Sequence, residues 1–183
     1  MTIATFKGFG GVRLEAEVAG DEHDPAILLV HGPGQSRADW SAVSAALVHE
    51  GRRVIALDMR GHGGSDWPAD GRYDFESLVE DLRAVLAQLG SRPVVVAATL
   101  GGWIAAAALA SDAATLAAGL VLVDMPARAE PGMAEGLTRR IAEAAASAGH
   151  SWDERAIDGP LVADMEALLL NAAPRLALPM LVV

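Results

Sequence analysis

The sequence of 183 residues contains no cysteine, which excludes disulfides, thiolate metal ligands, iron–sulfur clusters and a cysteine nucleophile. Lysine is almost absent too, because Lys7 is the single lysine among 14 basic residues, and 24 acidic residues outnumber these. The resulting formal net charge of -10 disfavours nucleic acid and anionic membrane surfaces as partners. With 52% hydrophobic and 21% charged residues, the composition is that of one ordinary globular domain.

The start of the chain lacks the basic and then apolar pattern of an export signal, so we expect a cytoplasmic protein. One uncharged run, at 93–111, has the length of a membrane span. It opens with three β-branched valines, however, and Gly101 and Gly102 interrupt it. We interpret this run as a buried strand, a tight turn and a buried helix, and we expect no membrane span.

Strand and helix patterns alternate through the first two thirds of the chain. Segments 2–6 and 12–18 predict a hairpin with one wet face, because apolar and charged residues alternate in the second of them. Continuous apolar runs at 26–30, 54–57, 94–98 and 120–123 are typical of strands buried on both faces. Helical stretches are expected at 39–50, 75–89 and 103–110. This order predicts a three-layer α/β fold with a mostly parallel sheet.

The alternation stops after residue 124, which predicts three regions. Residues 1–125 form the core, 126–175 form a helical cap insertion with helices near 133–148 and 161–170, and 176–183 begin a further core strand. A sheet edge at this last strand would have few partners, so a homodimer through that edge is a candidate assembly. We interpret the charged pair Asp153-Glu154 in the insertion as part of a solvated surface.

Polar and glycine-rich segments follow four of the predicted strands, at the edge where parallel sheets bind ligands. These are His31-Gly-Pro-Gly-Gln-Ser36, Asp58-Met-Arg-Gly-His-Gly-Gly-Ser-Asp66, Ala97-Ala-Thr-Leu-Gly-Gly102 and Asp124-Met-Pro126. In this order they resemble the α/β-hydrolase fold family, and the resemblance extends from the hairpin to the end of the chain. It implies a hydrolase that cleaves a small ester or related acyl bond, with a small-molecule substrate and no cofactor.

The resemblance also implies roles for single residues. Thr99 takes the position of the family's serine nucleophile, on a strained turn between strand and helix. The amide of Leu100 and the segment Gly32, Pro33 and Gly34 take the positions of the oxyanion hole. Trp40, close behind that segment, either lines an acyl pocket or belongs to the ordinary core.

Three of these positions depart from the family pattern. Thr99 replaces serine, and its branched β-carbon crowds attack and resists a positive φ. Ala97 replaces the first glycine of the motif and adds a β-carbon at a crowded turn. Pro33 has no N–H to donate to an oxyanion. We therefore expect the catalytic apparatus of this chain to be impaired or inactive.

The catalytic acid and base have no clear place in this sequence. Asp124 is a candidate acid, although a structural turn aspartate is the plainer interpretation. The family carries its histidine later than residue 183, so we expect the chain to be truncated before the acid and histidine region. We expect structural roles for His31 and His62, and we interpret His150, in the insertion, as a weak candidate base. The remaining histidines, at 23 and 49, lie in a loop and at a helix end, and the five together lack metal-ligand spacing, so we expect no metal.

Two functions remain open at this point. The first is an α/β hydrolase that acts on a small ester in its complete form. The second is a catalytically degenerate protein that retains the fold as a small-molecule binding or regulatory module. Hydrolysis of a generic ester that depends on Thr99 separates the two.

Overall fold

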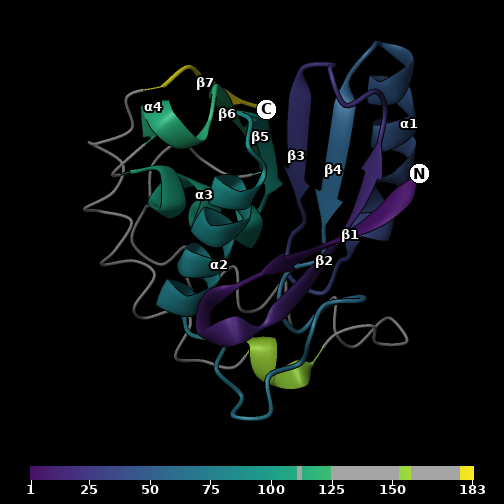
Figure 1. Cartoon of the computed structure of the whole chain (residues 1–183). Helices are drawn as coiled ribbons and strands as arrows, with labels where there is room; N and C mark the ends of the chain where they lie inside the picture. Colours follow the sequence, from purple (N-terminus) through teal and green to yellow (C-terminus); the bar gives the residue numbers. More distant parts are fainter. Residues whose placement is uncertain (111–112, 125–152, 158–177) are drawn as a thin grey trace.

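The computed structural model describes residues 1–110, 113–124, 153–157 and 178–183 (Figure 1). Within these ranges the strands follow the sequence prediction closely, and α1, α2 and α3 begin within three residues of the starts expected for the three predicted helices. The elements, in chain order, are β1 (Thr2–Lys7), η1 (Phe9–Gly11), β2 (Arg13–Ala19), β3 (Ala26–Val30), η2 (Arg37–Trp40), α1 (Ser41–His49), β4 (Arg53–Leu57), α2 (Phe75–Gln88), β5 (Val94–Ala98), α3 (Leu100–Leu109), α4 (Ala113–Leu116), β6 (Gly119–Val123), η3 (Glu154–Ile157) and β7 (Met180–Val182).

These strands form one seven-stranded sheet in the order β1-β2-β4-β3-β5-β6-β7. The hairpin of β1 and β2 is antiparallel and joins β4 antiparallel, whereas β4, β3, β5, β6 and β7 are parallel. The predicted α/β fold with an N-terminal hairpin is therefore confirmed. The strand expected within 176–183 is present as β7, and it lies beside β6 at the sheet edge with its apolar side chains exposed.

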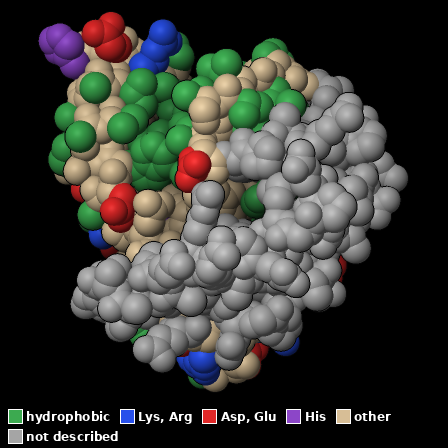
Figure 2. All heavy atoms as spheres, turned by 180° about the vertical axis from the view of Figure 1, so that it is seen from behind, with side chains coloured by type: hydrophobic (Ala, Val, Ile, Leu, Met, Phe, Trp, Pro, Cys, Tyr) green, Lys and Arg blue, Asp and Glu red, His purple; other side chains and the backbone are tan. Residues whose placement is uncertain are grey.

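Helices cover both faces of the sheet and make three layers (Figure 1). The larger core cluster joins inward side chains of the sheet to α2 and α3, with Leu28, Leu57 and Ile104 among its fully buried members. A smaller cluster around Leu29 and Val54 packs on the other face, against η2 and α1. The outer side of α1 exposes small apolar side chains, and hydrophobic atoms gather on that side of the molecule in Figure 2.

Local capping explains where two of the helices begin. Asp74 caps α2, because its carboxylate accepts hydrogen bonds from the Ser77 amide and hydroxyl at 2.8 Å. Ser36 and Asp39 form a reciprocal capping box that begins η2. Helix α3 differs from the prediction, since it begins at Leu100 rather than at residue 103.

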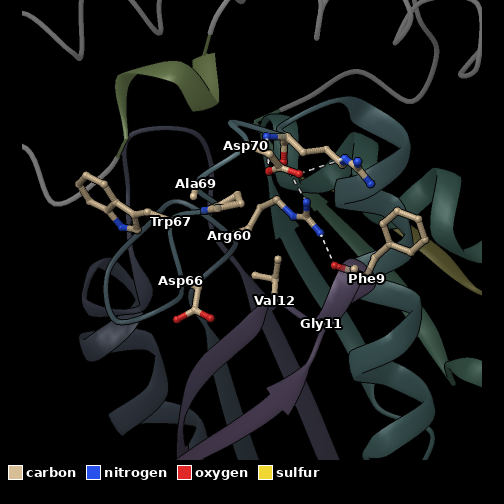
Figure 3. A pocket seen from close by; sticks show the side chains of 11 residues that line it. Phe9, Gly11, Val12, Arg60, Asp66, Trp67, Ala69 and Asp70 are labelled. Carbon is tan, nitrogen blue, oxygen red and sulfur yellow. Dashed lines mark hydrogen bonds and ion pairs between the residues drawn. The ribbon is translucent and has the colours of Figure 1, made fainter.

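Charged groups inside the fold connect the hairpin to the loop after β4. Arg60 and Asp81 are both buried and form a two-pronged ion pair. The Arg60 guanidinium also donates to the carbonyls of Phe9 and Arg72 (Figure 3). The Phe9 amide donates to Asp81 at 2.7 Å. Every branch of this guanidinium therefore has a partner, as a buried charge requires.

The uncharged run at 93–111 forms β5 and α3, as expected. Among the helices of the described residues, none has both the length and the apolar character that a membrane span needs. The helices expected near 133–148 and 161–170, and His150, lie outside the described residues.

One interpretation of the insertion is wrong. Asp153, which we expected on a solvated surface, is 7% exposed. Its carboxylate accepts a hydrogen bond from the Tyr73 hydroxyl at 2.6 Å, and its amide donates to the Gly61 carbonyl at 2.8 Å. Sequence spacing could not reveal this contact, because Tyr73 and Asp153 are 80 residues apart.

Candidate functional site

The candidate site lies at the carboxyl ends of β3 and β5, where the sheet order changes direction. From β3 the chain runs to β4 on one side and later to β5 on the other. The loops that follow the two strands meet at this switch point, and α/β proteins bind ligands at such points. The loop after β3 carries Gly32, Pro33 and Gly34, and Thr99 follows β5 directly.

Thr99 occupies a strained backbone conformation, with φ 47° and ψ -119°. A branched residue rarely adopts a positive φ, so the surrounding structure must hold it there. The hydrogen bonds that hold it are those from its own amide to the Val123 carbonyl at 3.1 Å and from the Gly102 amide to its carbonyl at 3.0 Å. Among the described residues, its buried Oγ1 has no hydrogen-bond partner.

Two glycines allow α3 and the loop after β3 to approach each other. A β-carbon added to Gly32 would collide with Thr99 Oγ1, and one added to Gly101 would collide with the carbonyl oxygen of His31. The hydroxyl of Thr99 therefore lies directly over the backbone of the segment that was expected to stabilise an oxyanion. Ala97, the other departure in this motif, is fully buried within β5.

The loop after β3 makes a tight turn. Pro33 and Gly34 occupy its two central positions, Gly34 has φ 72°, and the Gln35 amide donates to the Gly32 carbonyl at 3.3 Å. Proline followed by a residue with positive φ is the pattern of a type II turn. The Gly32 amide donates to Gln35 Oε1 at 2.9 Å, and the Gly34 amide donates to His62 Nε2 at 3.3 Å.

His31 and His62 are buried side by side, with ring centroids 4.9 Å apart. His31 Nε2 accepts a hydrogen bond from the Met59 amide at 3.1 Å, and His62 Nδ1 lies 3.0 Å from the Arg60 carbonyl. Burial lowers the pKa of His31 to about 4, and burial together with the neighbouring His31 lowers the pKa of His62 to about 3. Both rings are therefore neutral at neutral pH and bind the loops together, which agrees with the structural roles expected for them.

The other residues with expected roles lie on neighbouring elements. Leu100 is buried as the first residue of α3, so its amide has no acceptor within the helix. Asp124 is exposed at the end of β6 with φ 52°, a conformation that aspartate tolerates better than most residues. The ring of Trp40 packs against the smaller core cluster, on the face covered by α1.

A different cavity, of about 630 Å³, lies between the hairpin and the loop after β4 (Figure 3). Phe9 and Trp67 are its exposed aromatic residues, and Val12 and Arg60 also line it. Neither Thr99 nor the loop after β3 contributes to its walls. Within the part of the chain that the structure describes, no group of three or more histidine or acidic residues could hold a metal ion.

Sequence comparison identifies relatives of this chain. A family model described as the alpha/beta hydrolase fold matches residues 25–162. An esterase of Mycobacterium tuberculosis is 38% identical over 102 residues, which are 55% of this chain and 33% of the esterase. A mouse sn-1-specific diacylglycerol lipase is 36% identical over 115 residues, 62% of this chain and 37% of the lipase. The matched segment thus spans about a third of the length of these curated relatives.

A solved structure of a hydrolase also resembles this chain. Epoxide hydrolase A of Mycobacterium thermoresistibile superimposes with a TM-score of 0.63 and 27% identity, over 76% of this chain and 44% of that one. The family model covers most of the chain, and a strained residue between β5 and α3 is the geometry expected of such a protein. This chain belongs to the alpha/beta hydrolase fold family.

Proposed function

We propose that the protein hydrolyses a small ester or related acyl bond, with Thr99 as the nucleophile. The observation that carries the proposal is the buried Oγ1 of Thr99, which has no hydrogen-bond partner among the described residues and lies on a strained turn at the switch point. Strain at a single residue costs on the order of 1–3 kcal/mol, and folds tolerate it mainly where function requires it. A serine in place of Thr99 would have the same hydroxyl with less crowding.

In the proposed reaction, Thr99 Oγ1 attacks the acyl carbon and forms a tetrahedral intermediate. The hydroxyl proton passes to a base and then to the departing alcohol as its bond to the acyl carbon breaks. Water then cleaves the acyl-enzyme and restores the hydroxyl. The amide of Leu100 and that of Gly34 are the donors that we assign to the oxyanion, since Pro33 has none.

Low activity is part of this proposal. Pro33 cannot donate, and the Gly34 amide that takes its place already donates to His62. Full loss of one such donor typically lowers kcat on the order of a hundredfold or more, and a weakened donor lowers it in the same direction. The branched β-carbon of Thr99 adds crowding at the attacking oxygen. We expect a slow hydrolase that a serine at position 99 accelerates by roughly fivefold to tenfold, the equivalent of about 1 kcal/mol of relieved strain.

The relatives support the substrate class. Their names describe an esterase and a diacylglycerol lipase, which act on esters, and an epoxide hydrolase, which opens a related carbon–oxygen bond. We therefore favour a hydrolase over a binding module. The substrate that we propose is a small molecule that reacts at Thr99.

The proposal also includes the division of the chain into regions and the identity of the catalytic acid. We retain a core at 1–125, an insertion at 126–175 and a further strand from 176, and the pairing of β7 with β6 supports the last of these. Asp124 is the acid that we propose, because it follows the strand next to β5.

The exposed apolar side chains of β7 support self-association through the sheet edge, which sedimentation velocity would test.

The experiment compares three variants of the chain with p-nitrophenyl acetate as substrate. Thr99→Ala should abolish turnover, Thr99→Ser should raise kcat, and Thr5→Ala, on exposed strand β1, should leave it unchanged. A fluorophosphonate probe should form an adduct that mass spectrometry locates at Thr99. Ester hydrolysis that persists in Thr99→Ala would refute the nucleophile assignment. A chain that binds ester substrates without turnover, even with serine at 99, would favour the binding module instead.

A further inference from the structure

In the turn after β3, two backbone amides donate to side chains. The Gly32 amide is bonded to the side chain of Gln35, and Pro33 has no N–H. The Gly34 amide is bonded to an imidazole nitrogen, Nε2 of His62, which belongs to the loop after β4. A substrate oxyanion at this loop can therefore gain a donor only by exchange with one of these two acceptors.

We infer that His62 is a positioning residue that orients the peptide between Pro33 and Gly34 until the Gly34 amide passes from His62 Nε2 to the oxyanion. The inference rests on the proposed function, because it assigns a role within the same site. His62 itself does not contact the substrate. It acts by orienting the peptide bond between Pro33 and Gly34.

His62 is fixed in the form that this role requires. Its Nδ1 lies 3.0 Å from the Arg60 carbonyl, so Nδ1 carries the proton and Nε2 presents a lone pair. The ring is 5% exposed and packs against His31, and the amide of Asp153 holds the preceding residue through the Gly61 carbonyl. Among the described residues, His31, Asp58 and Asp153 are titratable groups that act on it, and the low pKa of His62 keeps Nε2 an acceptor at neutral pH.

The Gly34 amide is equally suited to exchange its acceptor. Its φ of 72° completes the turn that Pro33 begins, and this turn directs the central peptide away from the turn's own hydrogen bond. The distance of 3.3 Å to His62 is at the long end of hydrogen bonds, so the bond is weak. Exchange of such a neutral acceptor for a charged oxyanion is favourable, because bonds to ionised acceptors are roughly twice as strong.

The Gln35 side chain is the less suitable partner for such an exchange. Its bond to the Gly32 amide is shorter, at 2.9 Å, and Gly32 lies directly beneath Thr99 Oγ1. The Gly32 amide therefore serves to shape the turn, and Gly34 remains as the donor that His62 orients.

Amide spectroscopy tests the hydrogen bond independently of any activity. In ¹⁵N-labelled protein, His62→Leu should shift the Gly34 amide resonance and speed its exchange with solvent, whereas His62→Gln, which retains an acceptor, should restore much of the original position. The Gly32 and Met59 amides are internal controls, because they donate to Gln35 and His31. His49→Leu, an exposed histidine at the end of α1, is the matched control. A Gly34 amide unchanged in His62→Leu would overturn the inference.

Kinetics with p-nitrophenyl acetate test the role in the reaction. His62→Leu should lower kcat by at least about tenfold with KM little changed, since small displacements of catalytic groups have effects of that size or more. His62→Gln should recover most of the loss. A His62→Leu variant that is folded, loses the Gly34 bond and keeps its kcat would overturn the inference and leave the proposed function intact. Activity that survives Thr99→Ala would instead overturn the proposed function, and the assigned role with it.

Discussion

The buried ion pair of Arg60 and Asp81 allows a sharp test of how the hairpin is attached to the rest of the fold. Asp81→Ala would leave the Arg60 guanidinium buried at 1% exposure without its two carboxylate bonds, and the Phe9 amide without its acceptor. Removal of one partner of a buried pair typically costs 3–5 kcal/mol. For a domain of ordinary stability, about 5–15 kcal/mol, this is a large fraction of the free energy of unfolding.

Urea unfolding, followed by circular dichroism, measures the loss. The matched control is Glu80→Ala on the same helix, because Glu80 forms a half-exposed pair with Arg83 and such pairs contribute about 1 kcal/mol or less. If Asp81→Ala costs no more than Glu80→Ala, the reasoning is refuted. Should Asp81→Ala fail to fold, Asp81→Asn provides a milder version of the same test.

The double variant Arg60→Met with Asp81→Leu separates attraction from desolvation. Burial raises the pKa of Asp81 above its ordinary value even beside Arg60, which shows how costly the buried charge is. Replacement of both charges by apolar groups should therefore cost less than removal of the carboxylate alone. A double variant less stable than Asp81→Ala would contradict this.

Three further predictions concern strain, the Asp153 contact and acid. Thr99→Gly should raise the free energy of unfolding by about 1 kcal/mol or more, because glycine adopts a positive φ without strain. The same variant should abolish ester hydrolysis, because it lacks the hydroxyl. A lower melting temperature would contradict the strain argument. Tyr73→Phe should destabilise by about 1–3 kcal/mol in thermal melts, because it removes a buried hydrogen bond to Asp153; an unchanged melting temperature would show that the contact is dispensable. The Arg155 guanidinium and the Tyr73 hydroxyl lower the pKa of Asp153 to about 2, so its stabilising contribution is complete above about pH 4 and falls as pH approaches 2. Urea unfolding of Asp153→Asn between pH 5 and 2 should show a shallower loss, and equal slopes would refute the assignment.

The elements of the core could be predicted because each has a local signal. Continuous apolar runs marked β3, β5 and β6, and the helical stretch expected from residue 75 coincides with the start of α2. The start of α3 was missed by three residues, because the glycines at 101 and 102 disfavour a helix in isolation. In the fold they belong to it, since only glycine lets α3 approach the backbone of the loop after β3.

The candidate site was only partly predictable, because some of its contacts join segments that are far apart in the sequence. The position of Thr99 followed from its motif, and its positive φ agrees with the strained turn that the motif requires. The partners of the oxyanion loop did not follow, because Gly34 and His62 are 28 residues apart and no periodicity relates them. The burial of Asp153 was mistaken for exposure, since a charged pair in isolation indicates a solvated surface.

By itself, the amino-acid sequence determined the alternation of strands and helices, the parallel sheet and the loops that carry Pro33 and Thr99, because hydrophobic periodicity and turn residues act over short distances. Only the tertiary structure decided which acceptor holds the Gly34 amide, which carboxylate neutralises Arg60 and where Asp153 packs. Those contacts join segments far apart in the chain, and a buried polar group takes whichever partner the packing of the whole fold brings to it.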